Sequence, residues 1–92
     1  MVCYRSISDY AAREKYTKIA VPAVLAAGGR CLARSIAAKA YEHGIKERTV
    51  VVEFESLAKA IDAHDSPEYQ AALAVLGNGA ERDLRIVEGI DE

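Results

Sequence analysis

The sequence predicts an α+β protein of the ferredoxin-like class, a βαββαβ sandwich in which an antiparallel four-stranded sheet carries its helices on one face. Strand-like and helix-like segments follow in the order strand, helix, strand, strand, helix, strand. Two right-handed strand–helix–strand units in one sheet place both helical layers on the same side. The halves also resemble each other, because each has a serine before its helix, a glycine-containing break after it and then an arginine-bearing strand. We expect one domain over residues 1–92.

The clearest strand spans residues 49–54, where all side chains except one glutamate are β-branched or aromatic. Because side chains alternate along a strand, Val50, Val52 and Phe54 share a purely apolar face. That face is expected to meet the helices, and Glu53 points to the opposite side. The other expected strands are residues 2–7, residues 30–35 with an extension over 38–42, and residues 84–88.

The helices are delimited by residues that suit helix ends. Ser8 or Asp9 fits the N-cap of the first helix, which Gly28–Gly29 ends. Ser56 begins a short helix, and Ser66 with the proline after it begins a longer one. The core expected between sheet and helices consists of Tyr16, Ile19, Ala20, Val50, Val52, Phe54, Leu57, Ile61, Leu73, Leu84 and Ile86.

Composition and charge argue against several function classes. Twelve basic and fourteen acidic residues give a net charge of −2 at pH 7, which provides no general attraction to nucleic acid or to an anionic membrane. The longest apolar run, residues 19–27, is much shorter than the roughly 20 residues of a bilayer span. No signal peptide is recognised, so a cytoplasmic protein is expected. Cys3 and Cys31 are expected to be buried structural thiols, and neither a metal nor another cofactor is expected.

Five short motifs occur in an order and spacing that resemble a known family. They are GGR at 28–30, EF at 53–54, Ser56 two residues after it, SPEYQ at 66–70 and IVEG at 86–89. Together they resemble the domain of unknown function 1330 family over nearly the whole chain. The resemblance implies a homodimer that forms a dimeric α+β barrel, a fold that also hosts cofactor-independent monooxygenases and isomerases. The family has no settled activity, so the resemblance assigns no catalytic residue.

Strand alternation gathers charged side chains on the sheet face away from the helices. Three arginines and one carboxylate meet there in this prediction, which favours binding of a small organic anion in the barrel lumen. The alternative is a salt bridge between the glutamate and one of the arginines. The residues of this candidate site are Arg30, Arg34, Glu53 and Arg85.

A second group of candidates lies at the junction of the two later helices. His64, Asp65 and Tyr69 join the ligand site only if this junction turns toward the mouth of the lumen. Each also has a structural interpretation: a hydrogen-bonded histidine, a helix cap and a core aromatic residue.

Two functions therefore remain open at the level of the sequence. One is a small ligand binder or enzyme that acts on an anionic metabolite without a cofactor. The other is a non-catalytic dimeric interaction module in which the charges only pair. The sequence does not identify the ligand.

Overall fold

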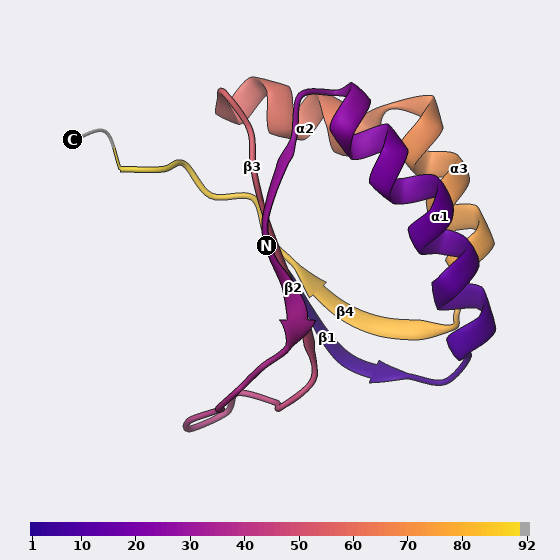
Figure 1. Ribbon diagram of the computed structural model, residues 1–92, viewed down its shortest axis with the longest axis vertical. Coiled ribbons are helices and arrows are strands. Elements are labelled where there is room, and N and C mark those ends of the chain that lie inside the picture. Colours follow the sequence, from indigo (N-terminus) through magenta and orange to yellow (C-terminus); the bar gives the residue numbers. More distant parts are fainter. Residues whose placement is uncertain (91–92) are drawn as a thin grey trace.

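The computed structural model describes residues 1–90. A strongly curved four-stranded sheet carries three helices along its concave side (Figure 1). This confirms the predicted α+β class. In chain order the elements are β1 (Val2–Ile7), α1 (Tyr10–Ala26), β2 (Arg30–Ile36), β3 (Arg48–Glu53), α2 (Leu57–Asp65), α3 (Pro67–Leu76) and β4 (Ala80–Leu84).

The strands pair antiparallel throughout, in the order β2-β3-β1-β4 that a ferredoxin-like fold requires. Val2 of β1 lies opposite Val50 of β3 on one side and Leu84 of β4 on the other. Paired residues share a face of the sheet. These three apolar side chains therefore lie in one row on the face toward the helices, which we call the inner face. The opposite side is the outer face.

A bulge in β2 changes the face to which one predicted site residue belongs. Between Cys31 and Ala33 the register with β3 shifts, so Leu32 is an extra residue in this strand. Arg30 keeps the outer face, whereas Arg34 lies on the inner face and lines a pocket there. The prediction that Arg34 shares the outer face with Arg30 is therefore wrong, because the extra residue shifts the alternation by one position.

The last strand lies earlier in the chain than predicted. It covers Ala80–Leu84 in place of residues 84–88. Gly79 fixes its start, because the Gly79 carbonyl accepts hydrogen bonds from the N–H groups of Ser8 at 2.8 Å and Asp9 at 3.0 Å. Charged side chains dominate this strand, so it lacks the apolar signal by which strands are recognised.

The connection between β2 and β3 is an irregular loop, and the predicted strand over residues 38–42 is wrong. The two strands separate after a bond from the Ala37 N–H to the Glu47 carbonyl at 3.0 Å. The loop then projects from the sheet as an arm (Figure 1). Tyr41 on this arm is largely exposed.

The helices begin where capping residues predict. Asp9 caps α1 by accepting a bond from the Ala12 N–H at 3.0 Å. Ser56 and Ser66 cap α2 and α3 in the same way. The Ser66 hydroxyl also donates to the Ala63 carbonyl at 2.7 Å and thereby joins these two helices. No helix within residues 1–90 is long and apolar enough to cross a membrane.

The glycine pair after α1 has two different roles. Gly28 adopts a φ of 92°, a left-handed conformation that ends the helix at little steric cost. Gly29 is buried, and a Cβ atom there would lie 2.6 Å from Val24 Cγ1 and 2.9 Å from Phe54 Cζ. The chain can therefore turn from α1 into β2 close to both side chains only because this residue has none.

The buried core cluster lies between α1 and α3. Ala72 has no exposed surface, and Tyr16, Ala20, Tyr69 and Leu76 are buried around it. Small side chains at this contact let the two helices approach each other. Of the other predicted core residues, Val50, Val52, Phe54, Leu73 and Leu84 are half-buried, and Ile19, Leu57, Ile61 and Ile86 are exposed.

Substitution of Ala72 tests the helix contact. Ala72→Leu is expected to lower the free energy of unfolding by about 1–3 kcal/mol, because the larger side chain overfills the contact. The matched control is Ala71→Leu, an exposed position on the same helix, which should change it by less than about 0.5 kcal/mol. Urea unfolding measures both. Equal stability of the two variants would contradict the packing described.

Candidate functional site

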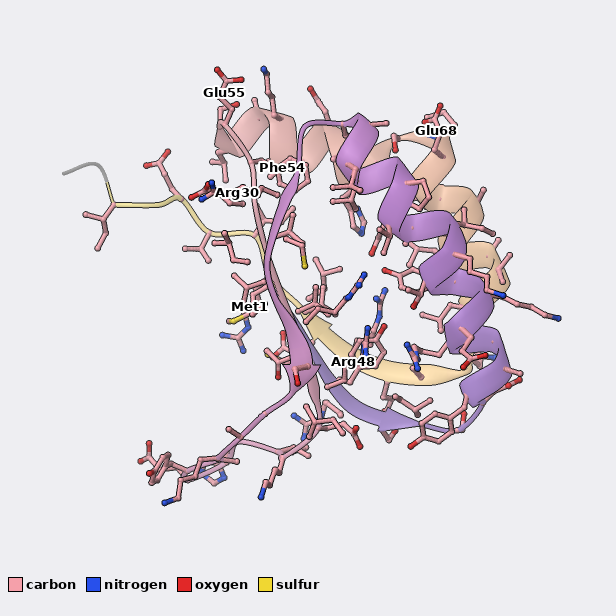
Figure 2. All side chains as sticks on the ribbon, in the orientation of Figure 1. Met1, Arg30, Arg48, Phe54, Glu55 and Glu68 are labelled. Carbon is pink, nitrogen blue, oxygen red and sulfur yellow. The ribbon has the colours of Figure 1, made fainter. Side chains whose placement is uncertain are left out.

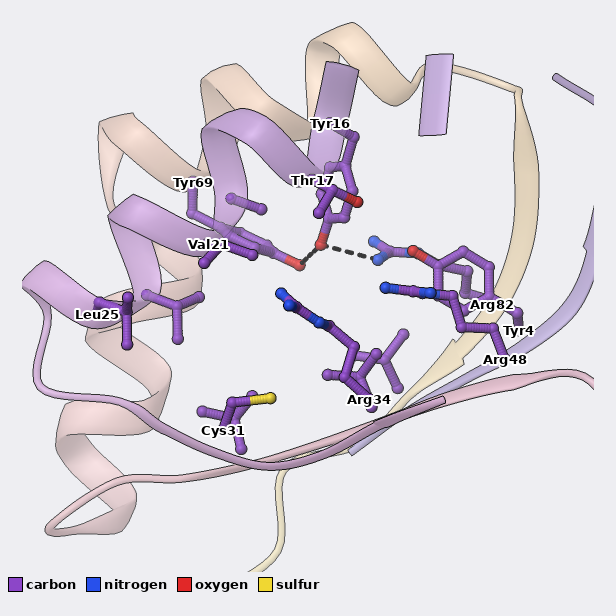
Figure 3. A pocket seen from close by; sticks show the side chains of 15 residues that line it. Tyr4, Tyr16, Thr17, Val21, Leu25, Cys31, Arg34, Arg48, Tyr69 and Arg82 are labelled. Atoms are coloured by element: carbon purple, nitrogen blue, oxygen red, sulfur yellow. Dashed lines mark hydrogen bonds between the residues drawn. The ribbon is translucent and has the colours of Figure 1, made fainter. Parts of the chain in front are cut away.

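A pocket lies between the inner face of the sheet and α1 (Figure 3). Measured out to its open mouth, so that solvent-filled space at the opening is included, it contains about 620 Å³ of space not occupied by protein atoms. We call it the inner pocket. Its arginines and tyrosines are Arg34, Arg48, Arg82, Tyr4, Tyr16 and Tyr69, and the rest of its lining is Thr17, Cys31 and apolar side chains of α1, β1 and β3.

Three guanidinium groups enter the inner pocket from three of the four strands. Arg34 comes from β2, Arg48 from β3 and Arg82 from β4, and no aspartate or glutamate of residues 1–90 lines the pocket with them. Partial burial lowers the pKa of Arg48, and the nearby cations Arg13 and Arg34 lower it further. Three positive charges thus enter a largely apolar pocket in a chain whose net charge is negative.

A chain of polar contacts crosses the inner pocket. Arg82 Nη1 donates to the Tyr16 hydroxyl at 2.9 Å, and the hydroxyl oxygens of Tyr16 and Tyr69 lie 2.5 Å apart. We call these two groups the hydroxyl pair. The Arg82 guanidinium also lies over aromatic rings, 4.9 Å from the Tyr16 centroid and 5.5 Å from that of Tyr4. Hydrogen bonding and cation–π contacts therefore hold this arginine.

The environment of the hydroxyl pair makes it a hydrogen-bond donor. Burial raises the pKa of Tyr16 above its usual value, and contact with Tyr69 raises it further, although Arg82 opposes the change. Tyr16 therefore keeps its proton at neutral pH and is not a base there. The two hydroxyls carry two protons and make one bond to each other, so one proton remains for another acceptor.

The Arg82 guanidinium remains charged in this setting. Burial lowers the pKa of Arg82, but the charge interaction and hydrogen bond with Tyr16, aided by Tyr69 and Tyr4, raise it overall. The pocket therefore keeps a fixed positive charge next to the hydroxyl pair.

The predicted arginines of the outer face are paired with carboxylates. Arg30 Nη2 lies 3.3 Å from Glu53 Oε1, which confirms the salt-bridge alternative. Arg85 donates from Nε and Nη2 to the two carboxylate oxygens of Asp83, both at 3.0 Å, and this contact lowers the pKa of Asp83. Figure 2 shows Arg30 on the outer side of the sheet and Arg48 on the inner side. The sequence predicted an excess of cations on the outer face, whereas the structure has it on the inner face.

Of the second group of candidates, only Tyr69 reaches the inner pocket. His64 Nδ1 lies 3.0 Å from Asp65 Oδ1, and its ring packs against that of Tyr69 with centroids 5.2 Å apart. His64 lines a second, broader groove. This groove adjoins the inner pocket, because Val2, Val24, Val50, Val52 and Tyr69 line both. Asp65 does not cap α3, because Ser66 does.

Sequence reasoning did not name Arg48, Arg82 or Tyr16 as site residues, although each lines the inner pocket. Arg48 alternates with Val50 and Val52, so extension of the clearest strand by one residue finds it on the inner face. Arg82 lies in the part of β4 that was not recognised as a strand. Tyr16 was assigned to the core, and it is buried, but the helical pattern contains no signal for the partners of its hydroxyl.

The cysteines differ from expectation, since Cys3 is half-buried and Cys31 is exposed and lines the inner pocket. Within residues 1–90, no three His, Cys, Asp or Glu side chains come together in a way that could hold a metal ion. The guanidinium groups of the inner pocket repel metal cations and attract anions.

The raised pKa of Tyr16 predicts a loss of stability in alkaline solution. The unfolded chain releases the proton at lower pH than the folded protein, so this contribution is complete below about pH 10 and declines as the pH rises above it. Urea unfolding over a pH series measures the decline. Tyr16→Phe should flatten it, and Tyr41→Phe, at an exposed tyrosine, should not. A Tyr16→Phe protein that declines as steeply as the parent would contradict the assignment.

Comparison with known proteins agrees with the motif-based assignment. No curated protein matches the chain closely enough to count as a relative. A family model does match, and it covers residues 1–90. The match confirms the family that the five motifs indicated. The chain belongs to the family described as Domain of unknown function (DUF1330).

Proposed function

We propose that the protein binds a small organic anion in the inner pocket. The observation that carries this proposal is the convergence of Arg34, Arg48 and Arg82 with no carboxylate among the described residues that line the pocket. Cations that are partly withdrawn from water and face one another destabilise the protein, and a bound anion relieves this strain. The outer face provides the contrast, because Arg30 and Arg85 have carboxylate partners there.

An unsatisfied donor next to this cluster supports the same proposal. Arg13 Nε is buried and donates to no acceptor within residues 1–90. Arg13 is near enough to Arg48 to lower its pKa. Since buried donors are normally satisfied, an acceptor brought to this region would complete its hydrogen bonding.

The inner pocket replaces the barrel lumen as the proposed location of the ligand. The hydroxyl pair adds a donor beside the three arginines, so a ligand oxygen that gains negative charge during a reaction would be stabilised there. This is the chemical environment that an enzyme acting through an enolate or a similar oxyanion requires. Binding is the part of this function that the geometry supports most directly.

Anion binding is tested with arginine-to-methionine variants, which keep most of the stem and remove the charge. Carboxylic acids are expected to raise the melting temperature of the parent, because a ligand at 100 times its dissociation constant stabilises by about 2.7 kcal/mol. Arg34→Met and Arg48→Met should lose most of this shift. Arg30→Met, on the outer face, is the control and should keep it. Inner-face variants that retain the full shift would refute the proposal.

We also propose that the outer face joins two copies of the chain in a symmetric dimer, as the family resemblance implies. Its arginines are paired, so the face can be covered without isolating a charge. Leu32, Val87 and Ile90 are exposed apolar side chains, and they line the same broad groove that His64 lines. The segment after β4 projects beyond the sheet (Figure 1). In this arrangement the interaction-module function belongs to the outer face and ligand binding to the inner pocket.

The dimer is tested by charge placed in this groove. Light scattering of the parent should give about twice the mass of one chain, and Leu32→Asp should reduce it to that of one chain, since an unpaired carboxylate opposes burial. Val75→Asp, at an exposed apolar position of α3, should remain dimeric. A parent that scatters as a single 10.0 kDa chain at micromolar concentration would contradict the proposal.

A further inference from the structure

The inner pocket is divided into a charged part and an apolar part. Figure 3 shows Arg48 and Arg82 on one side and Val21 and Leu25 of α1 on the other. The hydroxyl pair lies between the two parts, and the side chain of Arg34 extends toward it. A ligand that fills the pocket must therefore be anionic at one end and apolar at the other.

The charged part offers side-chain donors in place of backbone donors. α1 contributes residues from Tyr16 onward, beyond its first turn, so their N–H groups are engaged within the helix. The N–H of Tyr69, in the first turn of α3, is bound to Ser66 Oγ at 3.3 Å. Phosphate groups are often held by free N–H groups at a helix start, which this pocket lacks. Guanidinium forks match both carboxylates and phosphates, but the desolvation of a planar carboxylate costs less than that of a phosphate dianion.

The hydroxyl pair adds a requirement for the middle of the ligand. One of its two protons is used in the mutual bond, and Arg82 donates to the pair and supplies no acceptor. The remaining proton needs an oxygen that lies between the anionic and apolar ends of the ligand. A carbonyl or hydroxyl oxygen on the carbon next to a carboxylate has this position.

We propose that the inner pocket selects short carboxylic acids that carry a 2-oxo or 2-hydroxy group and an apolar side chain. The carboxylate lies at Arg34 and Arg48, the second oxygen accepts from the hydroxyl pair, and the apolar side chain packs against Leu25. Arg82 acts through Tyr16 and positions the hydroxyl pair. This inference rests on the proposed function, of which it names the ligand class.

Three probe acids separate these requirements, because each comparison changes one feature. Ketoleucine has the carboxylate, the oxo group and a branched apolar side chain; isocaproate lacks the oxo group, and pyruvate lacks the branched side chain. Titration calorimetry of the parent should show that ketoleucine binds about tenfold more tightly than either. Inorganic phosphate is the fourth probe and should bind more weakly than ketoleucine.

Two variants test whether the hydroxyl pair and Leu25 cause the preference for ketoleucine. Tyr16→Phe with Tyr69→Phe removes both hydroxyls and should bring ketoleucine and isocaproate to within about twofold of each other. Leu25→Ala, at a half-exposed position that the fold tolerates, should weaken ketoleucine several-fold and leave pyruvate unchanged. Val75→Ala, an exposed position of α3 outside the pocket lining, is the control and should match the parent.

These titrations distinguish failure of the ligand class from failure of anion binding. Equal affinities of the parent for all three acids, or tightest binding of phosphate, would overturn the ligand class and leave anion binding intact. Absence of binding for every probe would overturn the proposed function together with this inference. Should the double tyrosine variant not fold, the Leu25→Ala comparison still decides whether the apolar part contributes to selection.

Discussion

The hydrogen-bond chain from Arg82 through Tyr16 to Tyr69 connects β4 with both long helices, and the inner pocket depends on it. These side chains are long, so they link the layers while the valines of β3 beneath them remain only half-buried. A core closed by apolar packing alone would bring α1 down onto those valines and leave no space. The protein thus combines a compact contact between α1 and α3 with an open contact between the helices and the sheet.

Arginine side chains have different surroundings on the two faces of the sheet. On the outer face, Arg30 and Arg85 have carboxylate partners, but both pairs are largely exposed and contribute little to stability. Their effect is to neutralise that surface. On the inner face, Arg34, Arg48 and Arg82 have no carboxylate partner among the described lining residues, and the charges of Arg13 and Arg34 disfavour the charged form of Arg48. A chain of this size has little stability to lose, which supports the proposal that these cations serve ligand binding.

The fold class can be predicted from the sequence because it follows from local signals. Caps at Asp9, Ser56 and Ser66 and the alternation in β3 are each readable within a few residues. The face of the sheet on which a side chain lies also depends on pairing with other strands, which the local sequence does not contain. Leu32 looks like an ordinary strand residue, yet the bulge it forms is defined by pairing with another strand, and it decides the face of Arg34.

The candidate site was harder to predict than the fold for the same reason. Its cations come from β2, β3 and β4, and the strand that carries Arg82 contains too few apolar residues to be recognised alone. Tyr16 fits an apolar helical stripe as well as a polar role, and its partner Tyr69 lies 53 positions away in the chain. Strand alternation predicted a salt bridge between Glu53 and one of three arginines, and the pairing of β2 with β3 selects Arg30.

The aromatic lining of the inner pocket gives the protein an optical signal of its own. The chain contains five tyrosines and no tryptophan, so its near-ultraviolet absorption and emission come from tyrosine. Tyr4, Tyr16 and Tyr69 all line the inner pocket, and Arg82 contacts the rings of the first two. A molecule that enters and rearranges the hydroxyl pair alters the surroundings of most of the chromophores at once. Occupancy of the pocket is therefore observable in unlabelled protein, with no tryptophan emission to obscure it.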